Sequence, residues 1–216
     1  MGSDPMRVIH LIGGGDTGGA KTHVLNLLKE LNQSIDAQLF CFRKGDFSED
    51  AAKMGIPIEV IESGNPVVGL RELKRRLAGQ KVDIIHCHGW MTALAPLYIK
   101  KVYKDEPSFR DAKVIFSLYE DDFKQPFHAD FSNKLLLKGI AKKDIAGLKE
   151  PIDYRALCKL AADFSDGIIQ QSEHVNEEVL NYARESGKPV LEYQSPENFA
   201  EACNDFYDKV WETEQK

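Results

Sequence analysis

Residues Arg7–Leu31 read RVIHLIGGGDTGGAKTHVLNLLKEL, and this stretch decides the fold. Its first six residues form a short apolar run, which predicts a buried strand. A loop with five glycines in seven residues, Gly13–Gly19, follows it. Lys21–Leu31 then spaces its apolar residues as one face of a helix. A buried strand, a glycine loop and a helix in this order are typical of the first unit of an open α/β sheet.

The same alternation of strand and helix patterns continues to the end of the chain. Further strands are predicted at Ala37–Phe42, Pro57–Ile61, Val82–Cys87, Lys113–Leu118, Gly167–Gln171 and, more briefly, Pro189–Leu191. Helices are predicted between them, apart from an irregular excursion over residues 119–151. Strands joined by crossover helices lie parallel, and right-handed crossovers cover both faces of the sheet. We therefore expect a Rossmann-like, doubly wound α/β fold with six or seven parallel strands in three layers.

Two helix boundaries are predicted from single residues. Pro96 lies inside the apolar helix expected at Trp90–Tyr103, and it should shift the start of that helix or kink it. Ser172 is predicted to cap the helix that follows the Gly167–Gln171 strand. A last helix over Glu197–Val210 is expected to close the fold with an apolar face turned inward.

Length and composition favour one soluble domain over residues 6–216 of the 216-residue chain. Residues 1–5, MGSDP, are typical of a cloning remnant, with the natural start at Met6. The net charge of −6 argues against a nucleic-acid surface, because phosphate binding depends on clustered cations. No apolar run reaches the roughly 18 residues of a membrane span, and no signal peptide precedes the first strand. The four cysteines are far apart, which predicts buried thiols and a cytoplasmic location.

The glycine loop is the first candidate binding site. Ligands of open parallel sheets bind at the carboxyl ends of the strands, and the N–H groups of a helix start attract anions. A phosphate or a sugar hydroxyl could bind there, and the alternative is a loop that only makes a tight turn. Five glycines are more than a turn requires, so we favour binding.

Two known phosphate motifs fit this loop poorly. Gly13-x-Gly15-x-x-Gly18 matches the dinucleotide fingerprint, but the second strand ends in Arg43-Lys44, where an acid should hold the ribose. A dinucleotide oxidoreductase is therefore the weaker alternative. The stretch from Gly14 also resembles a P-loop, but it lacks the required Gly-Lys-Thr sequence.

The end of the fourth predicted strand, DIIHCHGW, is the second candidate site. His86 and His88 are two residues apart, so their rings share one face of the strand. No third or fourth metal ligand is apparent in the sequence, and we predict no metal site. His86 is interpreted as a hydrogen-bonded core residue. His88 lies at the edge, where an imidazole can donate a hydrogen bond to a sugar hydroxyl or a phosphate.

Residues 6–88 strongly resemble the opening of family-4 retaining glycosyltransferases of the GT-B class. The resemblance rests on a strand, a loop that closes in Gly-Gly, and a helix with a polar residue near its start. It implies that Gly18 and Gly19, with Thr17 beside them, face the cleft between two domains, next to the donor phosphates and the acceptor. No cofactor is implied, and a sugar nucleotide such as UDP-glucose or ADP-glucose is the expected substrate.

From about residue 82 onward the chain resembles the N-terminal domain of glycogen and starch synthases, above all the short synthase-like proteins of Bacteroides. The segments that carry this are WMTALAPLYIKK, KVIFSLYEDDF and YRALCKLAADFSDGIIQQSEHVNEEV. The resemblance implies that His88 faces the donor sugar. The usual Asp-Trp is replaced by Gly89-Trp90. The usual His-Asn pair after the fifth strand is replaced by an acidic run that begins at Glu120.

These resemblances together imply the acceptor-side domain of a retaining glycosyltransferase that acts on a sugar nucleotide and a glucan. They meet near residues 82–90, which suggests a chimera of two parental sequences. The second, nucleotide-binding domain of GT-B enzymes is not evident, so we expect the chain to be inactive alone and to self-associate through the face that domain would cover. Trp90 and Glu120 complete the candidate binding residues. The alternative is a chimeric folding module, engineered or natural, that has no activity.

Overall fold

The computed structural model describes residues 5–15 and 19–213, and it confirms the α/β class. Its sheet has seven strands, all parallel, in the order β3-β2-β1-β4-β5-β6-β7. The strands are β1 (Arg7–Ile12), β2 (Asp36–Cys41), β3 (Ile58–Val60), β4 (Ile84–His88), β5 (Lys113–Leu118), β6 (Gly167–Gln170) and β7 (Val190–Leu191). The predicted three-layer, doubly wound sheet is therefore the observed fold.

The strand order reverses between β1 and β4, the two strands at the centre of the sheet. Ile12, the last residue of β1, pairs in register with His88, the last residue of β4. The glycine loop and the His-x-His motif therefore leave the sheet side by side at its carboxyl edge. Open α/β sheets bind their ligands at such a switch point.

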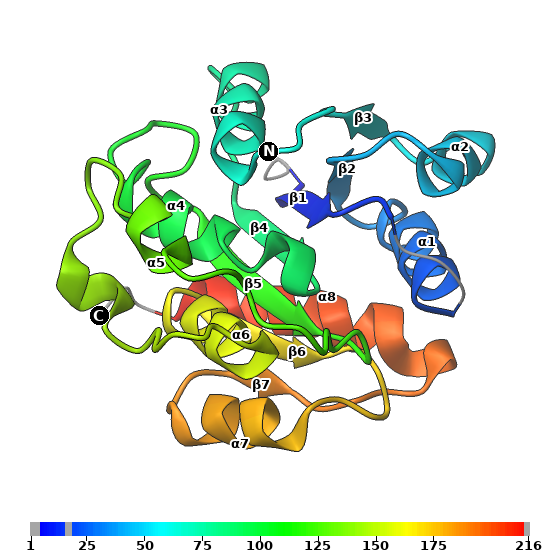
Figure 1. The fold of residues 1–216 in the computed structure, drawn as a ribbon. Helices are drawn as coiled ribbons and strands as arrows, with labels where there is room; N and C mark the ends of the chain where they lie inside the picture. The colour runs from blue at the N-terminus through cyan, green and yellow to red at the C-terminus, as the bar shows by residue number, and fades with distance from the viewer. Residues whose placement is uncertain (1–4, 16–18, 214–216) are drawn as a thin grey trace.

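The helices cover both faces of the sheet (Figure 1). Figure 1 shows α8 running behind the strands, on the opposite side from α4 and α6. α1 packs with α8 on that rear face, whereas α3, α4, α6 and α7 contribute to the core on the other face. The helices are α1 (Gly19–Leu31), α2 (Asp46–Lys53), α3 (Pro66–Arg76), α4 (Ala95–Lys101), α5 (Phe131–Lys134), α6 (Tyr154–Asp163), α7 (Glu177–Glu185) and α8 (Pro196–Glu212), with short 3₁₀ turns η1 (Trp90–Thr92) and η2 (Lys142–Ile145).

The rear face of the sheet changes from apolar to polar along the strands. At the amino end its buried side chains are Val8, Ile84 and Ile115, which pack on α8. Two residues further along each strand, the same face carries His10, His86 and Ser117, all fully buried. Alternation along a strand sets which residues share this face. A buried polar cluster therefore lies directly beneath the carboxyl edge of the sheet.

Two local predictions meet different outcomes. Pro96 shifts the helix start as expected, because η1 and α4 replace the single helix predicted over residues 90–103. Ser172 is not a helix cap. α7 begins later and is capped by Asn176, whose side chain accepts from the N–H of Val179, while the Ser172 hydroxyl accepts from the N–H of Glu120. A serine that directly follows a strand can serve the neighbouring loop as well as a helix.

Two further sequence expectations concern thiols and membranes. All four cysteines are free and buried, as predicted: Cys41, Cys87, Cys158 and Cys203. Across residues 5–15 and 19–213, none of the helices combines the length and the apolar character that a bilayer crossing requires.

Candidate functional site

The glycine loop is clamped between two neighbouring segments at the carboxyl edge. Gly14 has a φ of +87°, and a Cβ there would lie 2.7 Å from the backbone oxygen of Arg43. On the other side, a Cβ at Gly13 would lie 2.9 Å from the Cβ of Met91 in η1. Only glycine allows so close an approach of backbone to neighbouring atoms. The first two loop glycines therefore bring the ends of β1 and β2 and the turn after β4 together.

A cavity of about 130 Å³ opens where these segments meet. Its wall is largely apolar, with Phe42 from the end of β2, Leu70 from α3 and Leu94 before α4. Polar groups lie among them, including Arg43, Asn65 and Thr92. Binding sites for small molecules combine apolar walls with a few placed polar groups in this way. This cavity is the candidate ligand site of the described residues.

His88 lies at the same edge, but its ring is buried. Only 2 % of the residue is exposed, and both ring nitrogens have partners. Nδ1 lies 2.7 Å from the hydroxyl of Tyr119, and Nε2 lies 2.9 Å from Nδ1 of His10. A direct sugar contact through this ring would require one of these hydrogen bonds to break. The position of His88 agrees with the prediction, and its exposure does not.

His86 confirms the interpretation as a hydrogen-bonded core residue. Ser117 Oγ donates to Gln171 Oε1 over 3.2 Å, so it accepts from Nε2–H of His86 over 2.5 Å. The Tyr207 hydroxyl of α8 then donates to Nδ1 of His86 over 2.7 Å. These partners assign the Nε2–H tautomer to His86. The ring is thus held between the sheet and α8.

Burial keeps the three imidazoles neutral. It lowers the pKa of His10 to about 3 and the pKa values of His86 and His88 well below their usual range, where the neighbouring imidazoles lower them further. Desolvation disfavours the charged form of a basic group. Nε2 of His10 has no hydrogen-bond partner among the described residues, so the network ends there.

Comparison with known proteins places this architecture in a family. The sequence pattern of the starch synthase catalytic domain matches residues 68–192, more than half of the chain. The chain belongs to the starch synthase catalytic domain family. It is a glycogen-synthase-like glycosyltransferase domain of GT-B type. The match begins in α3 and ends after β7, so residues 6–67 lie outside it.

Two glycogen synthases illustrate the similarity in sequence. The enzyme of Pelodictyon phaeoclathratiforme is 50% identical over 52 residues, which are 24% of this chain and 10% of that protein. The enzyme of Koribacter versatilis is 23% identical over 134 residues, 62% of this chain and 25% of that protein. The chain thus spans at most about a quarter of the length of these curated relatives.

Solved structures show the same fold. The catalytic domain of starch synthase IV from Arabidopsis thaliana, bound to ADP and acarbose, has a TM-score of 0.62 at 14% identity, over 89% of this chain and 52% of that one. A sucrose-phosphate synthase structure from Thermosynechococcus elongatus has a TM-score of 0.53 at 8% identity, over 95% of this chain and 99% of that one.

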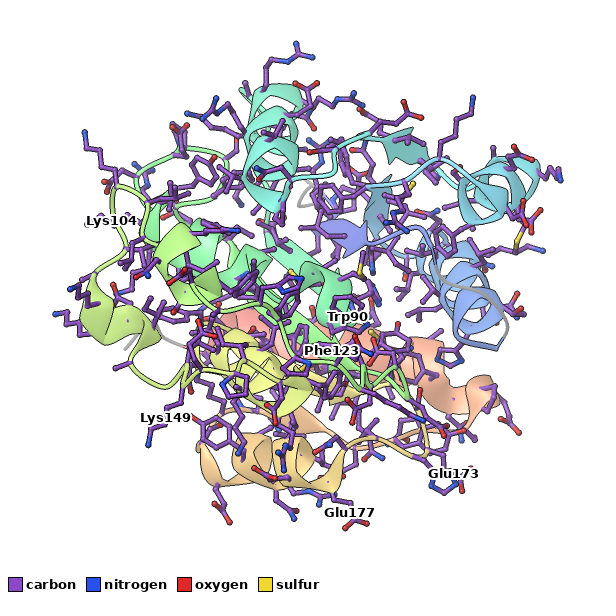
Figure 2. The ribbon with its side chains drawn as sticks, viewed as in Figure 1. Trp90, Lys104, Phe123, Lys149, Glu173 and Glu177 are labelled. Atoms are coloured by element: carbon purple, nitrogen blue, oxygen red, sulfur yellow. The ribbon has the colours of Figure 1, made fainter. Side chains whose placement is uncertain are left out.

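The remaining predicted site residues of this glycosyltransferase domain are Thr17, Gly18, Gly19, Trp90 and Glu120. Thr17 and Gly18 lie outside the described residues, and Gly19 opens α1. Trp90 is half-buried beside Phe123, with ring centres 4.9 Å apart (Figure 2). Glu120 is exposed in the loop after β5. The binding roles of these residues stay predictions.

The acidic run after β5 combines a bonded aspartate with two exposed acids. Asp121 accepts from the N–H of Trp90 over 3.2 Å and from the hydroxyl of Tyr154 over 2.9 Å. The second contact ties the loop to the start of α6. Glu120 and Asp122 are exposed. Asp121 therefore positions the turn that carries Trp90.

The histidine cluster contains a third member that the sequence analysis missed. His10 of β1 pairs in register with His86, so His10, His86 and His88 could offer three ligand atoms within 4.8 Å of one another. Two histidines on one tetrahedral Zn²⁺ place their ring centres about 5 Å apart. His10 meets this spacing, at 5.1 and 5.2 Å, but the rings of His86 and His88 are stacked at 3.9 Å. Stacked rings do not aim their nitrogens at one ion.

Excess Zn²⁺ is therefore expected to leave the melting temperature of the protein unchanged. An ion that binds the native state raises its stability in proportion to the logarithm of its concentration. Scanning calorimetry with Zn²⁺ and with EDTA checks this. A rise in melting temperature that disappears in His10→Gln would show that the cluster does hold a metal.

The sequence contains a pattern from which the place of His10 could have been predicted. His10 is one strand away from His86, and a parallel pairing of β1 with β4 would have placed both on one face. In the sequence, Arg43 indicates only that the end of the second strand does not suit a dinucleotide. The loop glycines that pack against it could not be matched to a partner before the strand order was known.

Proposed function

We propose that this domain forms the acceptor-side half of the cleft of a retaining glycosyltransferase that uses UDP-glucose or ADP-glucose and a glucan. The observation that carries the proposal is the meeting of the glycine loop, the His88 strand end and an apolar cavity at the switch point of a sheet in the starch synthase family. Its relatives in the solved structures include a starch synthase bound to ADP and acarbose and a protein of Anabaena bound to UDP.

The 216-residue chain by itself is proposed to lack turnover. It spans about half of the starch synthase structure that it resembles. Sugar transfer requires that the leaving diphosphate be stabilised and the acceptor be held in line with it. One half of a cleft supplies only part of this arrangement.

Fluorescence of Trp90 gives the most direct test of binding. The chain has two tryptophans, so Trp211→Phe leaves Trp90 as the sole reporter at the carboxyl edge. Titration with maltooligosaccharides, UDP-glucose and ADP-glucose is expected to change this signal for at least one of them. Trp90→Phe in the otherwise native chain is the matched control and should show no ligand-dependent change.

Activity separates the remaining outcomes. The chain alone is expected to release no nucleotide from UDP-glucose or ADP-glucose in the presence of maltoheptaose. If adding the separate C-terminal half of a glycogen synthase restores sugar transfer, this would support the proposal that the domain forms one half of the cleft. Nucleotide release by the chain alone would overturn the proposal that it lacks turnover. If none of these ligands changes the Trp90 fluorescence, the proposed function is overturned and the alternative of a folding module without activity is favoured.

A further inference from the structure

We propose that Asp121 and Trp90 form a subsite for one neutral sugar ring at the end of β4, where the carboxylate of Asp121 accepts hydrogen bonds from sugar hydroxyls. The inference rests on the proposed function and names a specificity-determining residue of the same half-cleft. The neighbouring acids Glu120 and Asp122 are exposed, so the loop after β5 favours a ligand that offers hydroxyl donors over one that carries negative charge.

The carboxylate of Asp121 occupies the space that a side chain at position 89 would need. A Cβ built on Gly89 would lie 2.6 Å from Oδ2 of Asp121, too close for two non-bonded atoms. Gly89 has a φ of +73° and a ψ of 175°, a conformation that is essentially restricted to glycine. The synthases that this chain resembles usually carry an aspartate there. In this chain the loop after β5 supplies the carboxylate at the end of β4 instead.

Two protein donors hold this carboxylate in place. Oδ2 of Asp121 accepts from the N–H of Trp90 over 3.2 Å, and Oδ1 accepts from the hydroxyl of Tyr154 over 2.9 Å. Because the two contacts use different oxygens, they fix the orientation of the carboxylate as well as its position. A carboxylate has about four acceptor positions, so one group can hold protein donors and also bind a sugar hydroxyl. An acceptor that is already ordered loses little freedom when a ligand binds.

Trp90 supplies the apolar part of the subsite. It opens η1 directly after Gly89, so its N–H joins it to the carboxylate of Asp121 within one turn. Both side chains are half-buried at the carboxyl edge. The indole meets the ring of Phe123 at 57°, so the two rings do not lie flat on each other (Figure 2). An aromatic surface beside a carboxylate suits a sugar, which combines an apolar C–H face with hydroxyls around its edge.

Isothermal titration of the intact chain with maltoheptaose tests this subsite. Asp121→Asn keeps the size of the side chain and one acceptor oxygen but removes the charge, and it should weaken binding by about tenfold or more. Asp122→Asn is the matched control, because Asp122 is exposed and accepts from the side chain of Asn176 over 3.5 Å. It should leave the affinity unchanged. Equal losses of affinity in the two variants would overturn the proposal.

Moving the carboxylate separates recognition from a purely structural role. Gly89→Asp should lower both the melting temperature and the affinity, because the new side chain meets Asp121 and strains the backbone. Adding Asp121→Gly removes the overlap and leaves one carboxylate at the end of β4. The double variant should therefore bind maltoheptaose more tightly than either single variant, and binding no better than Asp121→Gly alone would contradict the proposal. If the double variant does not fold, Asp121→Asn decides.

The outcomes also separate this inference from the proposed function. If maltoheptaose binds Asp121→Asn and the native chain equally, the half-cleft stands and Asp121 has no recognition role. The inference also fails if the native chain binds a nucleotide sugar but not maltoheptaose. If the native chain binds no sugar and Trp90 reports no nucleotide sugar, the proposed function itself fails.

Discussion

Acidification from about pH 7.5 to about pH 5 is expected to lower the free energy of unfolding by about 6 kcal/mol. The cause is the cluster of three fully buried imidazoles beneath the carboxyl edge. Burial lowers the pKa of His10 to about 3, and those of His86 and His88 lie well below their usual range. In the unfolded chain each imidazole titrates near its ordinary pKa of about 6.5.

The sign follows from which state binds the proton. Above about pH 6.5 both states are neutral, and the three rings contribute no pH dependence. As the pH falls below that value, the unfolded chain gains protons that the native state excludes, so unfolding becomes easier. Each ring then costs about 1.4 kcal/mol per pH unit, or about 2 kcal/mol at pH 5. A typical domain has only about 5–15 kcal/mol of stability, so the three together approach complete unfolding.

Urea unfolding followed by circular dichroism at both pH values measures this loss. His10→Gln removes one of the three buried rings, and the loss between the two pH values should fall to about 4 kcal/mol. Equal stability of the native chain at pH 7.5 and pH 5 would show that the rings are not held neutral.

Most of the sheet could be predicted from the sequence, because buried parallel strands are continuous apolar runs. RVIHLI and KVIFSL became β1 and β5 with the predicted bounds. The order of the strands could not be predicted, since it depends on contacts between segments far apart in the chain. Without the β1–β4 pairing, His10 had no visible relation to the His-x-His motif.

The site was predicted less completely than the fold, for the same reason. The sequence places the glycine loop and His88 at strand ends, and the structure brings these two strand ends together at the carboxyl edge. Whether a side chain at that edge reaches solvent depends on its neighbours. Tyr119 and His10 cover the ring of His88 and form hydrogen bonds with its two nitrogens. No sequence pattern predicts either contact. That Arg43 lines the cavity also depends on the strand order, which the sequence alone does not show.

Replacement of Tyr207 by alanine is expected to destabilise the protein by about 3–5 kcal/mol, the range for a large buried aromatic residue. Tyr207 is fully buried on α8 and packs against the apolar end of the rear face. Its hydroxyl also donates to His86, over 2.7 Å. Tyr207→Phe keeps the ring and removes only this donor. It should cost about 1–3 kcal/mol, because Nδ1 of His86 is then left buried without a partner.

Tyr182→Phe is the matched control for the hydroxyl. Its hydroxyl donates to Asp163 over 2.6 Å in an exposed position, where water can replace the lost partner. We expect a cost below about 1 kcal/mol there, measured by the same urea unfolding at pH 7.5. If Tyr207→Phe costs no more than Tyr182→Phe, the hydrogen bond to His86 contributes nothing beyond that of a surface contact. A larger cost would show that α8 stabilises the sheet through the polar cluster as well as through its apolar face, and that the switch point is held from below by a helix 121 residues away from His86 in the chain.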